Sequence, residues 1–266
     1  MIIEKIKMLK RDRSTRQSRS NGSHNITDKV GLKIYRANRA DRNYQAHYDR
    51  FEVPVKRWTT VLDALIYAKE HFDPSICIRY SCRMASCGSC GMMINGVPRL
   101  ACYTKISDLD DSTVTCEPLV NFPLIRDLVT DFSQFLNHHK NMKPYIIQND
   151  QSADVDDMPG LSEFKQSPED VDKYLQFSYC IKCGLCYSAC PVVATDVKFP
   201  GPQALAQAYR YFIDTRDNEA RERMNIVDNK HGIWRCHFAG SCSAVCPKGV
   251  DPALGIQLFR GYLMGF

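Results

Sequence analysis

Apolar and polar residues alternate in short runs through the first part of the chain, and Gly, Asn and Pro punctuate these runs. Alternation with a period of two places one set of side chains on one face of a β-strand. The runs predicted as strands are residues 31–36, 47–55, 91–94, 97–102 and 114–118. Asn95-Gly96 separates the third from the fourth, and this dipeptide favours a tight hairpin turn.

One helix is predicted within this strand-rich part. Thr60 can cap its beginning, with Asp63 three residues later, and Leu62, Leu65 and Ile66 supply a buried face at helical spacing. The pattern therefore predicts a compact sheet packed on one helix.

Beyond residue 121 the apolar spacing changes from two to three or four, which is typical of amphipathic helices. The first such stripe consists of Ile125, Leu128, Val129, Phe132 and Leu136. The second, in a helix predicted over 203–217, consists of Leu205, Ala208, Tyr209, Phe212 and Ile213. Asp251-Pro252 is expected to cap a last helix. The fold class is therefore α+β, with a sheet domain over 31–121 and a helical domain over 122–266.

The basic residues are concentrated at the beginning of the chain. Residues 1–44 hold 12 Lys and Arg against 4 Asp and Glu, although the whole chain carries only +5. Residues 1–30 are predicted to form a disordered basic arm, with a targeting peptide or a contact with acidic headgroups as alternatives. No stretch approaches the roughly 18 consecutive apolar residues that a membrane span needs. Work at a membrane would therefore require another subunit as the anchor.

The chain contains 13 cysteines, and most of them are clustered. An odd number, tight clustering and the lack of a secretory signal argue against a disulfide framework and favour a reducing compartment. Cys77 and Cys116 lie outside every cluster. Each is expected to be a small buried apolar residue rather than a ligand.

Two cysteine runs in the second half share one spacing. Cys180, Cys183, Cys186 and Cys190 follow Cys-x-x-Cys-x-x-Cys-x-x-x-Cys, and Pro191 comes next. In this ferredoxin signature three thiolates hold one cluster and the fourth ligates another. The second run has Cys236, Cys242 and Cys246, followed by Pro247, and its middle ligand position is occupied by Ala239. Seven thiolates fit one four-iron cluster and one cluster that lacks an iron.

A third run lies upstream, in the sheet domain. Cys82, Cys87 and Cys90 are spaced Cys-x4-Cys-x2-Cys, and Cys102 follows eleven residues later. This is the plant-type arrangement for a [2Fe–2S] cluster. Small residues fill the loop, so that backbone amides can approach and donate hydrogen bonds to the sulfurs. Zinc is the alternative for all three runs, but zinc sites usually combine two separated pairs of ligands, and the triplet beginning at Cys180 fits that pattern poorly.

With these motifs the chain resembles the iron–sulfur subunit of the succinate dehydrogenase and fumarate reductase family. The resemblance covers about residues 30–266 and depends on the three cysteine motifs, Arg79-Tyr-Ser-Cys-Arg-Met-Ala-Ser-Cys-Gly-Ser-Cys90, Cys180-Ile-Lys-Cys-Gly-Leu-Cys-Tyr-Ser-Ala-Cys-Pro191 and Cys236-His-Phe-Ala-Gly-Ser-Cys-Ser-Ala-Val-Cys-Pro-Lys248. It implies a β-grasp [2Fe–2S] ferredoxin-like domain followed by an α-helical ferredoxin domain with two cubane-type sites. It also implies a role in respiration and the tricarboxylic acid cycle.

The resemblance further implies three cofactors and their ligands. Cys82, Cys87, Cys90 and Cys102 would hold [2Fe–2S], Cys180, Cys183, Cys186 and Cys246 would hold [4Fe–4S], and Cys190, Cys236 and Cys242 would hold [3Fe–4S]. Electrons would pass one at a time between the FAD of a flavoprotein subunit and a membrane quinone. The substrate chemistry would belong to the flavoprotein. Membrane anchor subunits would hold the chain peripherally on the cytoplasmic or mitochondrial matrix face, and no nucleic acid is expected as a partner.

At the quinone end the sequence departs from the dehydrogenase members of that family. Those members carry a tryptophan shortly after the Cys-Pro of the first run, whereas residues 192–195 here are Val-Val-Ala-Thr. Pro191 is expected in the wall of the quinone pocket. His237 matches a histidine at the quinone end, and its alternatives are a hydrogen-bond donor behind the ligands or a solvated surface residue.

Two other functions remain as alternatives. One is an iron–sulfur subunit that serves a different flavoprotein, such as a thiol-linked fumarate reductase, although such relatives continue into a further cysteine-rich domain and this chain stops at Phe266. The other is a zinc-stapled binding module that uses its basic arm on acidic surfaces. The motifs Gly-Leu-Cys-Tyr and Gly232-Ile-Trp-Arg-Cys236 favour the fumarate reductase branch, but the direction of electron flow stays open.

Overall fold

The computed structural model describes residues 29–41, 43–109, 111–148 and 166–265. The predicted basic arm lies outside these ranges except for its last two residues. The chain divides into two compact units, each taken by itself below. The first comprises Met1–Ser133, Ile181–Cys190 and Gly240–Pro247, and the second comprises Gln134–Cys180, Pro191–Ala239 and Lys248–Phe266.

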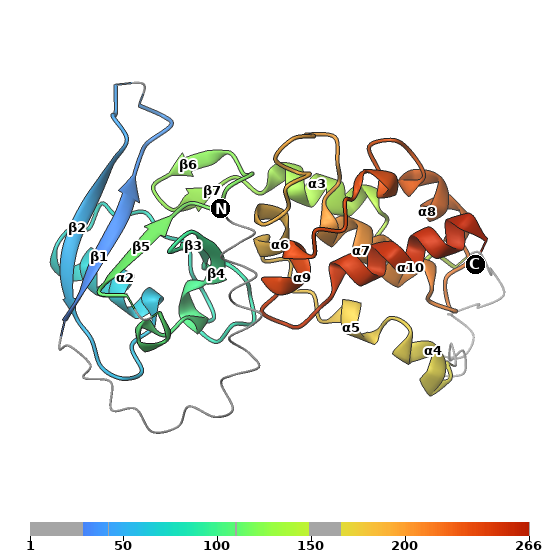
Figure 1. The fold of residues 1–266 in the computed structure, drawn as a ribbon, viewed down its shortest axis with the longest axis horizontal. Helices are drawn as coiled ribbons and strands as arrows, with labels where there is room; N and C mark the ends of the chain where they lie inside the picture. The colour runs from blue at the N-terminus through green and yellow to red at the C-terminus, as the bar shows by residue number, and fades with distance from the viewer. Residues whose placement is uncertain (1–28, 42, 110, 149–165, 266) are drawn as a thin grey trace, which may run out of the picture. The chain divides into compact units, whose positions relative to one another are not determined.

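The first unit is built on a five-stranded mixed sheet in the order β2-β1-β5-β3-β4 (Figure 1). Its strands are β1 (Lys29–Arg36), β2 (His47–Pro54), β3 (Gly91–Ile94), β4 (Val97–Leu100) and β5 (Thr113–Glu117). The central pair β1–β5 is parallel, and the other neighbours are antiparallel. Along β1 buried residues alternate with more exposed ones, which confirms the period of two seen in the sequence.

Helix α2 (Val61–His71) covers one face of this sheet. The Thr60 hydroxyl accepts the Asp63 amide at 3.2 Å, and the Asp63 carboxylate accepts the Thr60 amide at 3.0 Å. This reciprocal capping box confirms the predicted start of the helix, and such a cap typically contributes about 1 kcal/mol. Leu65 of α2 and Leu32 and Ile34 of β1 are fully buried in the same core. Each such side chain contributes roughly 1.5–3 kcal/mol by leaving water.

The predicted strand over 97–102 ends earlier than expected. Strand β4 stops at Leu100, and residues Ala101–Tyr103 form a short 3-10 turn, η2. The Thr104 hydroxyl donates to the Leu100 carbonyl at 2.9 Å across this turn. Cys102 therefore leaves the sheet plane, with its amide directed to Cys90 Sγ at 3.4 Å instead of to a neighbouring strand. A second short turn, η3 (Ile106–Asp108), follows.

The helical stripe predicted to begin at Ile125 is wrong over its first part. This segment forms a two-stranded hairpin, β6 (Leu124–Arg126) and β7 (Val129–Thr130), with Asp127 at φ 48° in its turn. The Asp127 carboxylate is buried and accepts the amides of Ala37 at 3.1 Å and Cys77 at 2.8 Å. These partners lie far away in the sequence. Their hydrogen bonds outweigh the local helical spacing because the buried carboxylate has no water to replace them.

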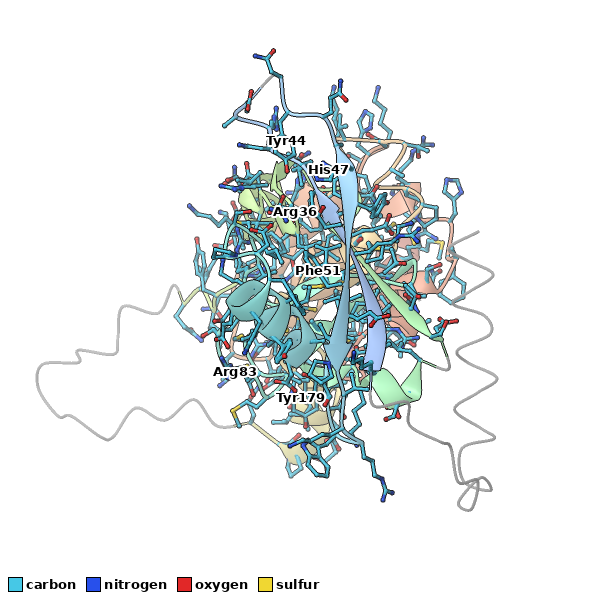
Figure 2. All side chains as sticks on the ribbon, turned by 90° about the vertical axis from the view of Figure 1, so that its left-hand side faces the viewer. Arg36, Tyr44, His47, Phe51, Arg83 and Tyr179 are labelled. Atoms are coloured by element: carbon cyan, nitrogen blue, oxygen red, sulfur yellow. The ribbon has the colours of Figure 1, made fainter. Side chains whose placement is uncertain are left out.

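Arg36 connects several segments around this hairpin. Arg36 is almost fully buried at the end of β1. Figure 2 labels this residue and His47, which lies on the neighbouring strand β2. Nη1 donates to Asp49 at 2.7 Å and also to Asp73, and Nη2 donates to the Ser75 hydroxyl at 2.7 Å. Nε lies 3.3 Å from the Asp127 carboxylate. A single cation thus holds two strands, the segment after α2 and the β6–β7 turn.

After β7, every regular element among the described residues is an α-helix or a short 3-10 turn, as predicted. These elements are α3 (Ser133–Asn141), α4 (Pro168–Asp172), α5 (Leu175–Ser178), α6 (Leu185–Ser188), α7 (Pro202–Phe212), α8 (Ala220–Val227), η4 (Ile233–Arg235), α9 (Ser241–Ala244) and α10 (Pro252–Met264). In α3 the buried aromatic is Phe135, whereas Leu136 of the predicted stripe is exposed. Among the described residues no helix combines the length and apolar character needed to cross a membrane.

The second unit has its core between α7 and α10. Leu205, Ala208 and Tyr209 are buried as predicted, and the rings of Phe212 and Phe259 stack with their centroids 4.5 Å apart. Helix α7 ends at Phe212 and not at the predicted residue 217. The buried Asp214 carboxylate accepts the Arg216 amide at 3.1 Å and forms a turn there. At the start of α10, Asp251 accepts the Leu254 amide at 3.0 Å, which confirms the predicted cap.

Candidate metal centres

The loop between α2 and β3 directs backbone amides at cysteine sulfurs. Cys82 Sγ accepts the amides of Met84 at 3.4 Å, Ser86 at 3.3 Å and Cys87 at 3.3 Å. Cys102 Sγ accepts the Ala85 amide at 3.4 Å. These donors favour sulfur in its anionic form, because an N–H group stabilises negative charge.

The other two cysteines of this loop also receive backbone amides. Cys87 Sγ accepts the Ser89 amide at 3.5 Å, and Cys90 Sγ accepts the Cys102 amide at 3.4 Å. Each of the four sulfurs predicted to bind [2Fe–2S] thus accepts at least one backbone amide. This donor set fits an iron–sulfur group, whose thiolate ligands carry negative charge and take N–H hydrogen bonds.

Left-handed backbone conformations give the loop its curvature. Arg83, Ala85 and Gly88 have φ values of 56°, 57° and 76°. Positive φ is uncommon for residues other than glycine, and such strain persists only where the surroundings support it. Here the strained residues turn successive N–H groups toward the inside of the loop. This is the arrangement that backbone anion-binding nests use.

Two of the thiols in this loop differ in their electrostatic environment. The hydrogen bond from Ser89, followed by amide hydrogen bonds, lowers the pKa of Cys87 to about 6. Burial raises the pKa of Cys90 to about 12. Cys87 is exposed and Cys90 is buried, so one edge of the loop faces solvent and the other faces the core.

The two C-terminal cysteine runs have matching backbones. In the first run Lys182 has φ 54° and Gly184 has φ 77°, and α6 begins directly afterwards. In the second run Phe238 has φ 52° and Gly240 has φ 70°, and α9 begins directly afterwards. The residue between each left-handed pair is Cys183 in the first run and Ala239 in the second. Ala239 therefore occupies the position that corresponds to Cys183 without providing a sulfur.

Sequence reasoning missed Asn121, which supports the first of these runs. Its side-chain amide lies 3.2 Å from the Tyr187 carbonyl, 3.0 Å from the Ser188 carbonyl and 3.2 Å from the Cys190 carbonyl. The Tyr187 and Ser188 carbonyls belong to the last turn of α6, where a helix cannot satisfy all of its carbonyls internally, and the Cys190 carbonyl follows just after it. The residue also has φ 68°, a conformation that asparagine tolerates. Its position just after a predicted strand was the only available signal.

Sequence reasoning also missed Arg260, which supports the second run from α10. Its Nη2 donates to the carbonyls of Ile233 and Cys236, each at 2.7 Å, and its guanidinium lies 5.7 Å from the centre of the Trp234 ring. The amide of Phe238 approaches Cys236 Sγ at 3.4 Å. Arg260 thereby holds the backbone at Ile233 and at Cys236 against α10.

The two residues predicted at the quinone end and the two cysteines outside the motifs differ in their exposure to solvent. His237 is exposed, as are Phe238 and Trp234 on either side of the same segment, and Pro191 is half-buried. Cys116 is fully buried in the core, as expected, and burial raises its pKa. Cys77 is only half-buried. The ligand sets of all three clusters stay predictions.

Two family models match the chain. The first, described as a 2Fe-2S iron-sulfur cluster binding domain, matches residues 31–137, and the second, a 4Fe-4S dicluster domain, matches residues 176–250. They fall on the amide-lined loop and on the paired runs described above. Fold, donor set and family models together define an iron–sulfur electron-transfer protein and exclude the zinc-stapled module.

Sequence relatives narrow this class. The chain is 47% identical over 234 residues to the fumarate reductase iron-sulfur subunit of Haemophilus influenzae, with 86% of this chain and 90% of the relative covered. It is 36% identical to the mitochondrial succinate dehydrogenase [ubiquinone] iron-sulfur subunit of Dictyostelium discoideum, with 88% and 82% covered. A chain of the Mycobacterium smegmatis Sdh1 complex in the apo form superposes with a TM-score of 0.78 at 27% identity, with 89% and 96% covered. The chain belongs to the family of fumarate reductase and succinate dehydrogenase iron–sulfur subunits.

Proposed function

We propose that this chain is the electron-carrying subunit of a fumarate reductase and connects the FAD of a flavoprotein subunit with a membrane quinone. Its relatives in Haemophilus influenzae and Mycobacterium tuberculosis, at 47% and 46% identity, are named fumarate reductase iron-sulfur subunits. The relative at 36% identity is named for succinate dehydrogenase. These identities support the reductase branch, in which electrons flow from quinol toward fumarate.

The thiolates would hold three groups with distinct ligand sets. Cys82, Cys87, Cys90 and Cys102 would hold [2Fe–2S], the amide-lined loop being its cradle. Cys180, Cys183, Cys186 and Cys246 would hold [4Fe–4S], and Cys190, Cys236 and Cys242 would hold [3Fe–4S]. When bound, these groups supply one-electron redox chemistry, and the chain sets their potentials through ligation, amide donors and burial.

The observation that carries this assignment is the matched backbone around Cys183 and Ala239. Both runs keep the same pair of left-handed residues before a four-residue helix. The residue between them is Cys183 in the first run and Ala239 in the second. A loop that keeps the ligand geometry but lacks the ligand supports a three-iron centre beside a four-iron one.

The second run would also form the quinone end. His237 is exposed beside Cys236, and the exposed aromatic rings of Trp234 and Phe238 flank it. An imidazole N–H directed at a quinone oxygen would stabilise the negative charge that develops there on reduction. Aromatic side chains offer apolar surface for the ring of the quinone. Pro191 would contribute to the same wall.

The partners follow from this assignment. Substrate chemistry would take place on the flavoprotein, and membrane anchor subunits would hold the chain peripherally on the cytoplasmic or matrix face and complete the quinone pocket. The described helices are too short or too polar to act as such an anchor. This chain itself needs no nucleophile and no general base.

The test is to purify the complex through this chain, identify the subunits that accompany it, and record low-temperature EPR spectra. We expect a flavoprotein with covalent FAD and a sharp signal near the free-electron position in the oxidised protein, from an odd-electron three-iron centre. Quinol-dependent fumarate reduction should exceed quinone-dependent succinate oxidation. A spectrum with four-iron centres at both C-terminal sites would contradict the ligand sets.

A further inference from the structure

Gly88 of the [2Fe–2S] loop lies directly against Cys183, the middle ligand of the first C-terminal run. A Cβ atom at Gly88 would come 2.7 Å from Cys183 Cβ and 2.8 Å from Cys183 Cα. Real Cβ contacts are essentially never shorter than 3.0 Å. The two segments are therefore closer than any other residue at position 88 would allow.

Gly91 borders the same place. A Cβ there would lie 3.2 Å from the Cys183 carbonyl oxygen and 3.2 Å from Leu185 Cδ2. The Gly91 amide donates to the Gly88 carbonyl at 3.3 Å, so the two glycines belong to one tight turn of the loop. Cys183, Leu185, Cys90 and Met92 are buried together in the core of the first unit, so water does not separate the segments.

Gly88 also adopts a backbone conformation that favours glycine, with φ +76°. Arg83 and Ala85 show that this loop accepts left-handed residues that carry a side chain. The conformation alone therefore does not require glycine at position 88. The requirement comes from the backbone and side chain of Cys183.

We propose that Gly88 is a positioning residue for electron transfer, because its missing side chain brings the ligand loop of [2Fe–2S] into contact with a ligand of [4Fe–4S]. One electron crosses this contact at a time. The donor site is oxidised by one electron, the acceptor site is reduced by one, and no atom or proton moves. Electron tunnelling weakens steeply with distance, and a packed, dry contact between two ligand segments offers a short route.

This inference rests on the ligand sets proposed above, which assign Cys87 and Cys90 to one site and Cys183 to the other. The two can be tested separately. The EPR signals of the wild-type complex test the ligand sets. The interaction between those signals tests the role of Gly88.

The experiment compares Gly88→Ala and Gly91→Ala with Gly249→Ala in the assembled complex. Gly249 has φ +72° and nothing within 4 Å of a built Cβ, so it matches the strain at Gly88 without the contact. Gly91→Ala introduces a methyl group at the same contact without a left-handed residue. The measurements are iron content, the potentials of each centre, and the microwave-power saturation of the reduced [2Fe–2S] signal, which responds to a nearby paramagnetic centre.

In Gly88→Ala we expect the [2Fe–2S] signal to saturate at several-fold lower power than in the wild type, with both potentials retained. Rapid freeze-quench should show slower electron exchange between the two sites. Gly91→Ala should change both quantities in the same direction by less, and Gly249→Ala should leave them unchanged. If Gly88→Ala loses iron, the saturation and the electron exchange of Gly91→Ala alone decide whether the contact matters.

Unchanged saturation and exchange in an iron-replete Gly88→Ala complex would overturn the inference and leave the proposed function intact. An equal change in Gly249→Ala would overturn it as well, because general backbone strain would then be the cause. Loss of iron from both contact variants would place these glycines in cluster retention instead of coupling.

Discussion

Under the proposed ligand sets, the composition of the last cluster depends on Ala239. This residue stands between two left-handed residues, where the first run has Cys183. We expect Ala239→Cys to convert the three-iron centre toward a four-iron centre with a lower potential, since an added thiolate increases the negative charge on the cluster. EPR with redox titration measures both effects.

The matched control for that substitution is Ala239→Ser. Its side chain has similar size, but a neutral hydroxyl is a poor iron ligand in place of a thiolate. The serine variant should therefore keep the three-iron signal. A four-iron centre in both variants, or in neither, would contradict the view that position 239 is a vacant ligand position.

His237 should act on the quinone and not on the clusters. A hydrogen bond to a charged group contributes about 1.5–3 kcal/mol, so we expect His237→Ala to slow quinone turnover by about tenfold or more. Dye-linked succinate oxidation should stay near the wild-type rate, because a soluble dye can take electrons upstream. The two assays are run on the same purified complex.

His231→Ala provides the control, because its imidazole lies in the same segment but pairs with Asp196 at 2.8 Å. It should leave both assays near their wild-type values. An equal loss of both activities in His237→Ala would indicate a role in folding or cluster retention, and unchanged quinone turnover would make His237 a solvated surface residue.

At the scale of the elements, helix α6 depends on a side chain from another part of the chain. Asn121 donates toward three carbonyls at the end of this four-residue helix, which lies between Cys183 and Cys190. A helix this short has almost no stability of its own. The interaction at its end therefore keeps the ligand-bearing loop in place.

Asn121→Asp is the sharpest test of this interaction. The carboxylate has the same shape and tolerates the same left-handed backbone, but it cannot donate and would face carbonyl oxygens. We expect a loss of about 1–3 kcal/mol in the free energy of unfolding, together with reduced iron content. Urea unfolding and iron analysis measure these effects. Asn218→Asp is the control at an exposed site with one amide partner, and a loss as large there would contradict the assignment.

For the whole molecule, the charge cluster around Arg36 sets a limit on acid stability. The hydrogen bond from Arg36 is the largest cause that lowers the pKa of Asp73 from 3.8 to about 2. A carboxyl group with a depressed pKa stabilises the folded state above its unfolded pKa. This contribution is lost as the pH falls from about 4 to about 2.

Asp73→Asn should therefore lower the free energy of unfolding at pH 7 by about 1–2 kcal/mol. The deficit should stay constant between about pH 5 and pH 8, because the wild-type carboxylate is fully ionised throughout that range. Urea unfolding at several pH values measures it. Asp172→Asn, at an exposed position, should cause no such loss, and a deficit that varies within this range would contradict the role of Arg36.

Local signals in the sequence correctly predicted much of this fold. The alternation along β1, the capping box at Thr60 and the Asp251 cap of α10 depend on residues within a few positions of one another. The chemistry of the site was equally local, since cysteine spacing restricts which thiolates can reach one cluster. Residues close together in the sequence determine such features, and distant parts of the fold contribute little to them.

Tertiary structure decided the features that depend on distant residues. The hairpin at Asp127 replaced a predicted helix because its carboxylate bonds to an amide 90 residues away, and Asn121 reaches α6 across 66 residues. The close approach of Gly88 to Cys183 has no signature in either motif. The cysteine pattern by itself therefore determined that this protein binds iron–sulfur clusters. How the ligand segments are held and brought into contact was decided only by folding, because burial and long-range hydrogen bonds act between residues that the sequence keeps far apart.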